Sequence, residues 1–228
     1  MDIIESIFSY GTSVCMCCNN KRLLKNMAID CGQVGVCNEC LKSIKPTKGE
    51  GAFEGTEFLS YLIAPLYYNG KTRKLIKNLK FYGEFKSAEV LYEIFKSLPE
   101  ETPHLLDFDM VIPVPLSRQR DNERGYNQAE LIAKSIADVL CLPLYANALK
   151  KIRNTDRQSN MSKIERLTNI KDAFSVNDNV TQKRIILVDD IYTTGNTLNV
   201  CAKELIKNGA EEVVGVCAAI TIKDKMYF

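Results

Sequence analysis

The sequence has a single histidine, His104, and lacks any long apolar run. Because His104 stands alone in an acidic, proline-containing segment, enzymes that depend on a Ser-His-Asp triad or a Cys-His pair are excluded. No apolar run approaches the ~18 residues of a membrane-spanning helix. The first eight residues carry Asp2 and Glu5 and lack the basic segment of a secretory signal. We therefore expect a cytoplasmic protein without membrane insertion.

Excess charge is also lacking, since the formal net charge of +2 is too small to indicate nucleic-acid binding by itself. Residues 71–80, however, carry five basic residues and no acidic one, and Phe81 and Tyr82 follow directly. Basic side chains beside aromatic rings suit single-stranded nucleic acid, but an ordinary solvated helix face has the same composition. We keep both interpretations; the candidate DNA contacts are Lys74, Lys77 and Lys80.

Cysteine, in contrast, is abundant: the chain has nine, and in a reducing compartment these argue for metal ligation and buried thiols instead of disulfides. Two Cys-x-x-Cys turns, at 15–18 and 37–40, are separated by eighteen residues, a spacing typical of a four-cysteine zinc ribbon. Each turn presents two thiolates, and four thiolates complete the tetrahedral shell of a structural zinc. We predict zinc ligation by Cys15, Cys18, Cys37 and Cys40.

The choice of ligands leaves alternatives open. Cys17 adjoins Cys18 and could replace it, and Cys31 precedes a glycine as in a zinc knuckle but has no partner two residues later. Redox chemistry at a Cys-x-x-Cys pair and an unligated, poorly ordered head are the competing interpretations. The other cysteines fall on apolar faces of predicted elements and are expected in the core: Cys141, Cys201 and Cys217.

The most informative segment is residues 185–197. Four apolar residues predict a buried strand over 185–188, and Asp189 and Asp190 stand where it ends. A loop rich in threonine and glycine follows, and an amphipathic helix begins near Thr197. Ligands of open α/β sheets bind at the carboxyl ends of strands, and backbone N–H groups at a helix N-terminus bind anions. Carboxylates beside such a loop suit a sugar phosphate.

Two other motifs share features with this segment. Response-regulator receivers carry paired aspartates near the start of a domain, without a following Thr-Thr-Gly-x-Thr loop. Gly195 lacks the Gly-x-x-x-x-Gly-Lys-Ser/Thr pattern of a Walker A loop. All thirteen positions instead resemble the phosphoribosyl pyrophosphate (PRPP) signature of type I phosphoribosyltransferases.

Predicted strands and helices alternate along the chain, which indicates a parallel α/β sheet. We expect strands over 61–68, 109–115, 184–189 and 212–220, and helices over 71–80, 85–98, 124–140 and 197–208. The strand over 109–115 leads into a second loop with Arg118, Arg120 and Arg124, whose guanidinium groups suit bidentate bonds to a pyrophosphate. Residues 153–158 form a polar stretch of the kind that closes over a charged ligand.

Several segments, in chain order, resemble the ComF family of late competence proteins. They are the cysteine-rich head, Pro-Val-Pro-Leu at 113–116, Arg-Gly-Tyr-Asn-Gln at 124–128, Arg-x-Thr-x-x-Gln at 153–158, Ser-x-x-x-Arg-x-x-Asn at 162–169 and the PRPP signature. The resemblance implies a type I phosphoribosyltransferase fold, a parallel sheet flanked by helices, with a small N-terminal zinc ribbon. We accordingly expect a four-cysteine zinc ribbon over 1–45, a linker over 46–60 and a phosphoribosyltransferase-like domain over 61–228.

The resemblance also implies roles for individual residues. Asp189 and Asp190 would contact the ribose hydroxyls, directly or through Mg²⁺, and Arg118 would join them in catalysis. The 5′-phosphate would be held by Thr193, Thr194, Gly195, Asn196 and Thr197, and the pyrophosphate by Leu116, Ser117 and Arg118. The implied cofactors are a structural zinc and Mg²⁺ with PRPP. The implied process is natural transformation, with a helicase-like competence protein as partner.

Two hypotheses from different classes follow. In the first, the protein transfers a phosphoribosyl group to an unidentified acceptor and releases pyrophosphate. In the second, it is a non-catalytic adaptor with the same fold that binds single-stranded DNA or the helicase partner. Pyrophosphate release over a panel of bases and amines distinguishes the two.

Overall fold

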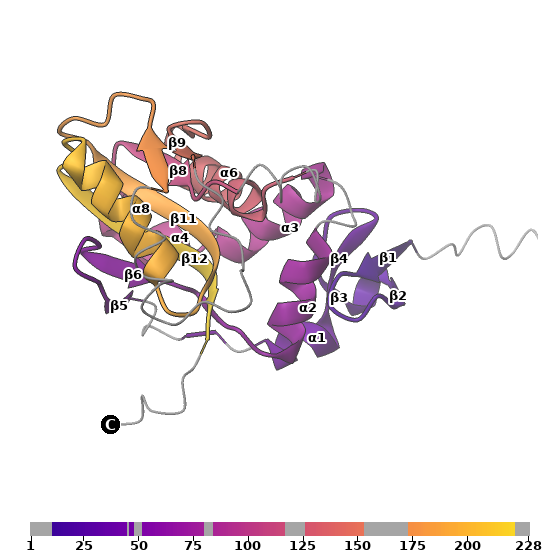
Figure 1. The fold of residues 1–228 in the computed structure, drawn as a ribbon. Helices are drawn as coiled ribbons and strands as arrows, with labels where there is room; N and C mark the ends of the chain where they lie inside the picture. The colour runs from indigo at the N-terminus through magenta and orange to yellow at the C-terminus, as the bar shows by residue number, and fades with distance from the viewer. Residues whose placement is uncertain are drawn as a thin grey trace, which may run out of the picture.

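The computed structural model describes residues 11–44, 46–47, 52–79, 84–116, 126–152 and 173–221. Its centre is a six-stranded sheet in the order β5-β6-β12-β11-β8, in which β7 pairs with β12 farther along than β6 (Figure 1). All pairings are parallel except that of β5 with β6. The strands are β5 (Ala52–Glu54), β6 (Tyr61–Ile63), β7 (Leu66–Tyr67), β8 (Met110–Pro113), β11 (Arg184–Tyr192) and β12 (Glu212–Ile220). The predicted parallel α/β sheet is thereby confirmed.

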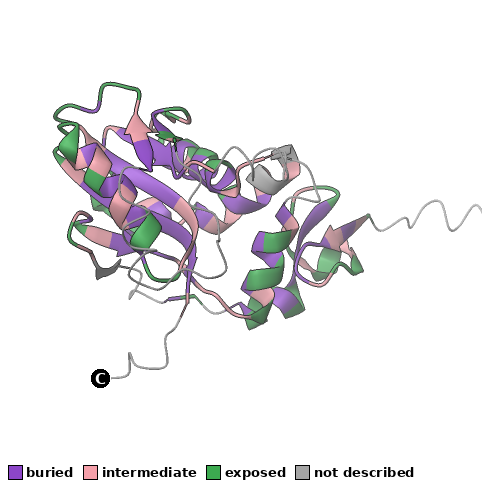
Figure 2. Ribbon diagram, viewed as in Figure 1, coloured by how far each residue is buried: buried purple, intermediate pink, exposed green. Residues whose placement is uncertain are grey.

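Helices cover both faces of this sheet. Helix α8 (Asn196–Lys207) packs on one face and α6 (Gln128–Leu140) on the other (Figure 1). Successive residues of a strand point to opposite faces. Alternate residues of β11 therefore belong to different core clusters, Ile185 and Leu187 with α8, and Ile186 and Val188 with α6. Burial on both faces explains why the strand is a continuous apolar run (Figure 2).

The predicted helices are confirmed, with shifted ends. They are α2 (Gly70–Asn78), α3 (Glu84–Phe95), α6 and α8, and a short α4 (Leu98–Glu101) follows α3. Asn69 caps α2 by accepting hydrogen bonds from the next N–H groups, and Asn127 caps α6 in the same way, so α6 begins at Gln128 and not at residue 124. Among the residues that the structure describes, no helix is long and apolar enough to cross a bilayer.

Two strand predictions need correction. The strand expected over 61–68 is interrupted, because Pro65, which lacks an N–H group, lies between β6 and β7. The strand expected to end at Asp189 continues to Tyr192. Part of the stretch 46–60, expected to be a linker, is strand β5 at the edge of the main sheet.

The cysteine-rich head forms its own four-stranded sheet in the order β2-β1-β4-β3, in which β1 and β4 are parallel. Its elements are β1 (Thr12–Cys15), β2 (Lys21–Leu23), β3 (Met27–Asp30), β4 (Val34–Cys37) and α1 (Asn38–Ser43). Met16 and Val36 of the head share one core cluster with Leu75 of α2 and Phe95 of α3. The head therefore packs directly against these two helices (Figure 1).

The expectation that Cys141 lies in the core is wrong, whereas Cys201 and Cys217 are buried as predicted. Cys141 is exposed and forms the C-cap of α6 with a φ of 54°. This left-handed conformation ends the helix and turns the side chain away from the buried face.

Candidate functional site

The acidic pair lies where β11 extends beyond the end of its neighbour β8. Strand β11 pairs with β8 only as far as Val188, whereas β12 accompanies it to Tyr192. The N–H of Val114 still donates to the Val188 carbonyl oxygen at 2.8 Å, and the chain then leaves the sheet. Asp189 and Asp190 therefore occupy a stretch of strand with one open edge, at the carboxyl end of the sheet.

Each carboxylate accepts the N–H group of the following residue. Asp189 Oδ1 accepts from Asp190 N at 2.8 Å, and Asp190 Oδ1 accepts from Ile191 N at 2.7 Å. Burial and the neighbouring charge of Asp190 raise the pKa of Asp189 to about 8. A bound cation relieves such crowding of acids, and oxygen ligands of this kind suit Mg²⁺. The residues present therefore fit a magnesium ion or the hydroxyls of a sugar.

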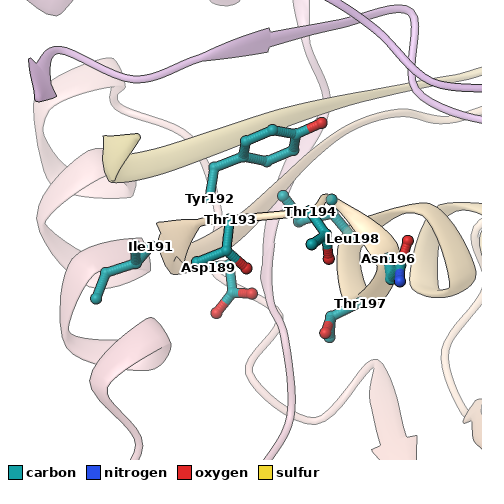
Figure 3. Close-up of a pocket in the computed structure, with 9 residues that line it drawn as sticks. Asp189, Ile191, Tyr192, Thr193, Thr194, Asn196, Thr197 and Leu198 are labelled. Carbon is teal, nitrogen blue, oxygen red and sulfur yellow. The ribbon is translucent and has the colours of Figure 1, made fainter. Parts of the chain in front are cut away.

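The turn after β11 requires a glycine at position 195. Gly195 has a φ of 74°, and a Cβ atom there would lie only 2.5 Å from Tyr192 Oη. The ring of Tyr192 lies on the opposite side of the turn from the Asp189 carboxylate (Figure 3). Tyr192 thus packs against the turn on the side away from Asp189, a role that its place in the motif did not predict.

Helix α8 begins directly after this turn and presents an uncapped N-terminus. Gly195 is its N-cap, and within the described part of the chain no side chain caps this end. The N–H groups of the first turn are consequently available to an anion, which the helix dipole also favours. Asp189 and Thr197 flank the same space beside the turn (Figure 3). Hydroxyl, carboxylate and N–H groups therefore meet at one point.

These groups line a small pocket. Its lining residues are Asp189, Ile191, Tyr192, Thr193, Thr194, Gly195, Asn196, Thr197 and Leu198. All five predicted phosphate-loop residues are among them, and Asp190 is adjacent. Leu116 is half-buried at the end of a described segment. The predicted residues Ser117, Arg118 and Lys80 and the polar stretch 153–158 lie outside the described residues.

The four predicted zinc ligands come together in the head. The sulfur atoms of Cys15, Cys18, Cys37 and Cys40 all lie within 4.8 Å of one another. A tetrahedral zinc with bonds of about 2.3 Å would place its sulfurs about 3.8 Å apart, so the cluster fits this ion. The N–H of Cys37 donates to Cys15 Sγ at 3.4 Å, a bond that favours a thiolate.

The two alternative cysteines lie differently with respect to this cluster. Cys17 is buried beside it, and its hydrogen bond to Cys15 lowers the pKa of the Cys15 thiol to about 3. Cys31 is half-buried at the far end of β3, where burial raises its pKa to about 11. Among the described residues, neither belongs to the group that could hold a metal.

The basic stretch is only partly described. In α2, Thr72, Leu75 and Ile76 are buried. The opposite face exposes three cations, Arg73, Lys74 and Lys77. Helix α2, which carries this cationic face, lies beside the head (Figure 1). His104, to which no role was assigned, packs edge-to-face on Tyr61 with ring centroids 5.0 Å apart.

Comparison with known proteins agrees with this geometry. Residues 127–226 match the phosphoribosyl transferase domain family. The chain is 33% identical over 184 residues to Competence protein F of Haemophilus influenzae, covering 78% of this chain and 75% of that protein. The chain belongs to the ComF family. It therefore combines the architecture of a type I phosphoribosyltransferase with a four-cysteine head.

Two further relatives place this ComF-family chain among competence and DNA-utilization proteins. It is 33% identical to Competence protein ComFC of Bacillus subtilis, over 62% of this chain and 56% of that protein. It is 27% identical to DNA utilization protein YhgH of Escherichia coli, over 92% of this chain and 91% of that protein.

The raised pKa of Asp189 predicts a pH dependence of stability. Between about pH 4 and pH 8 the folded protein keeps this carboxyl protonated while the unfolded chain ionises it. The stabilising contribution is thus complete below pH 4 and is lost as the pH rises toward 8. The wild type should therefore lose unfolding free energy between pH 5 and pH 8, whereas Asp189→Asn should not. We expect the unfolding free energy of Asp189→Asn minus that of the wild type to increase over this range, measured by urea denaturation. The exposed Asp178→Asn should track the wild type, and parallel profiles for all three proteins contradict the prediction.

The cysteine cluster predicts which thiols retain a metal. We expect one zinc per chain in the wild type and in Cys31→Ser, and loss of the zinc in Cys40→Ser, because Cys40 belongs to the cluster and Cys31 does not. Elemental analysis of dialysed protein measures this directly. Full zinc retention by Cys40→Ser would show that the cluster is not the binding site.

Proposed function

We propose that this ComF-family protein binds PRPP with Mg²⁺ at the Asp189–Thr197 segment and acts in the uptake and handling of transforming DNA. The observation that carries the proposal is the uncapped N-terminus of α8, reached through the left-handed turn at Gly195, beside two adjacent carboxylates. The names of the relatives, Competence protein F and DNA utilization protein, support the biological process. A cytoplasmic location fits this role.

Each group of the site has a task toward this ligand. The N–H groups of the first turn of α8 donate to the 5′-phosphate, together with the hydroxyls of Thr193, Thr194 and Thr197. The carboxylates of Asp189 and Asp190 accept the ribose hydroxyls or hold the magnesium ion, which supplies positive charge toward the pyrophosphate. Because Asp189 keeps a proton near neutral pH, binding of a cation there would displace that proton.

If the protein is an enzyme, the reaction would be the transfer of a phosphoribosyl group from PRPP to an unidentified acceptor. The bond between ribose C1 and the pyrophosphate oxygen breaks, the oxygen keeps the electron pair, and a nucleophile of the acceptor forms the new bond to C1. Positive charge develops on the ring, as in glycosyl transfer generally. The chain would contribute chiefly orientation and charge: the carboxylates hold the ribose face, and Arg118 is proposed to neutralise the leaving group.

Calorimetric titration with PRPP in the presence of Mg²⁺ tests the ligand. We expect saturable one-site binding to the wild type and at least ten-fold weaker binding to Asp190→Asn, because the substitution removes one of the two charges that hold the ribose and its magnesium. Asp178→Asn, an exposed carboxylate elsewhere on the surface, should bind like the wild type. Equal affinity of all three proteins would contradict the assignment. Pyrophosphate release over a panel of bases and amines then separates an enzyme from a binder.

A second function is favoured by the cationic face of α2. Here the protein is a non-catalytic adaptor that binds single-stranded DNA or a helicase-like competence protein. Arg73, Lys74 and Lys77 are exposed on one helix and can neutralise successive phosphates.

The salt dependence of DNA binding tests this face. Binding becomes weaker as salt rises, so log K plotted against log salt has a negative slope. Reversing the charges of Lys74 and Lys77 to Glu should make this slope less steep by about 1.4, since each lost phosphate contact on a single strand contributes about 0.7. The matched control reverses two exposed lysines outside α2, Lys134 of α6 and Lys150. A fluorescence-anisotropy salt series with a labelled oligonucleotide gives the slopes. Equal slopes for both double variants would exclude α2 as the contact.

A further inference from the structure

A loop from the N-terminal half of the chain contacts the first turn of α8. The side-chain oxygen of Asn199 accepts hydrogen bonds from the Thr56 hydroxyl and from the Phe58 N–H, the latter at 3.2 Å. The loop, residues 55–60, connects β5 to β6 and belongs to the stretch 46–60 that was expected to be a linker. It therefore reaches the helix that begins the candidate phosphate site.

Backbone hydrogen bonds hold this loop in a defined shape. Thr56 N donates to Leu59 O at 3.0 Å, which closes a tight turn, and Ser60 N donates to Val213 O of β12 at 2.9 Å. A Cβ atom at Gly55 would lie only 1.9 Å from Leu59 O, so the close approach of the backbone requires glycine there. The donors of the loop are therefore fixed relative to the main sheet.

Apolar and cation–π contacts accompany the two hydrogen bonds. Leu59 of the loop and Leu198 of α8 are buried in one core cluster, and each has its Cδ1 atom 3.6 Å from the position of a Cβ at Gly215. Gly215 of β12 thus leaves space for both leucines on the sheet. Lys203 Nζ lies 5.2 Å from the centroid of the Phe58 ring, within cation–π distance. The loop therefore contacts α8 over its first two turns.

Asn199 occupies the position in α8 at which the hydrogen bonds of the helix begin. The N–H groups of residues 196–198 have no preceding helical carbonyl to bind, and they are the groups assigned above to the 5′-phosphate. The N–H of Asn199 makes the first hydrogen bond of the helix, to Gly195 O at 2.8 Å. Asn199 thus joins the loop 55–60 to the left-handed turn, and a displacement of Asn199 would move the first-turn N–H groups with it.

We propose that Thr56 and Asn199 are positioning residues of the PRPP site, through which the loop 55–60 holds the first turn of α8 in the orientation that meets the 5′-phosphate. The inference rests on the proposed binding of PRPP. Neither residue belongs to the signature 185–197 or to the described residues that line the pocket, so both act through the helix. Donors that are fixed before the ligand arrives lose less entropy on binding, and the loop therefore raises affinity by preorganisation.

The affinity of the full chain for PRPP with Mg²⁺, measured by calorimetric titration, tests the positioning role. Thr56→Val keeps the shape of the side chain and removes its hydroxyl, whereas Thr56→Ser keeps the hydroxyl. We expect about five-fold weaker binding by Thr56→Val, the effect of one lost hydrogen bond, and wild-type affinity for Thr56→Ser. A merely structural role would lower the stability of Thr56→Val and leave its affinity unchanged. Equal affinities of the two variants therefore overturn the proposal.

Amide hydrogen exchange without ligand tests the contact between loop and helix separately. In Thr56→Val the amide of Asn199, which is bonded to Gly195 O, should exchange faster than in Thr56→Ser. The amides of residues 132–136 in α6, on the opposite face of the sheet, should exchange alike in both variants. Unchanged exchange at Asn199 overturns the positioning role even where PRPP binds. A wild-type chain that binds no PRPP overturns the proposed function itself, which distinguishes the two failures.

Discussion

The candidate site depends on the unequal length of two neighbouring strands, because β11 continues beyond the point where β8 ends. Backbone groups of a strand alternate between its two neighbours, and the Val188 carbonyl is the last group of β11 that β8 satisfies. The N–H of Asp190 faces the edge that β8 has left, and it donates to Asp189 Oδ1 instead. The carboxylates are therefore held by the backbone at an open sheet edge, where a ligand can reach them. A β8 strand two residues longer would close that edge.

The part of the site that depends on local sequence could be predicted. A continuous apolar strand, two acids, a glycine at a left-handed turn and an amphipathic helix follow one another within about twenty residues, so short-range rules place them correctly. The grouping of the four cysteines of the head was likewise predicted, because the Cys-x-x-Cys spacing fixes each pair locally. In both cases the structure brings together the residues that the pattern indicated.

Contacts between distant segments could not be predicted in this way. The strands of the head are three or four residues long and have no clear periodicity, so none was expected. Cys141 follows an apolar helix face and looked like a core residue, but a left-handed cap at the helix end exposes it. The role of Tyr192 depends on its tertiary packing against Gly195. A sequence pattern contains no signal for such contacts.

The central claim is that the first turn of α8 and the preceding loop receive the phosphate of an activated ribose. Titration of ¹⁵N-labelled protein with PRPP and Mg²⁺, followed by amide NMR, tests it residue by residue. The account predicts that the largest saturable shifts fall on the amides of residues 193–198, because these N–H groups would donate to the phosphate. Saturating shifts confined to other parts of the molecule, with these amides unmoved, would contradict it.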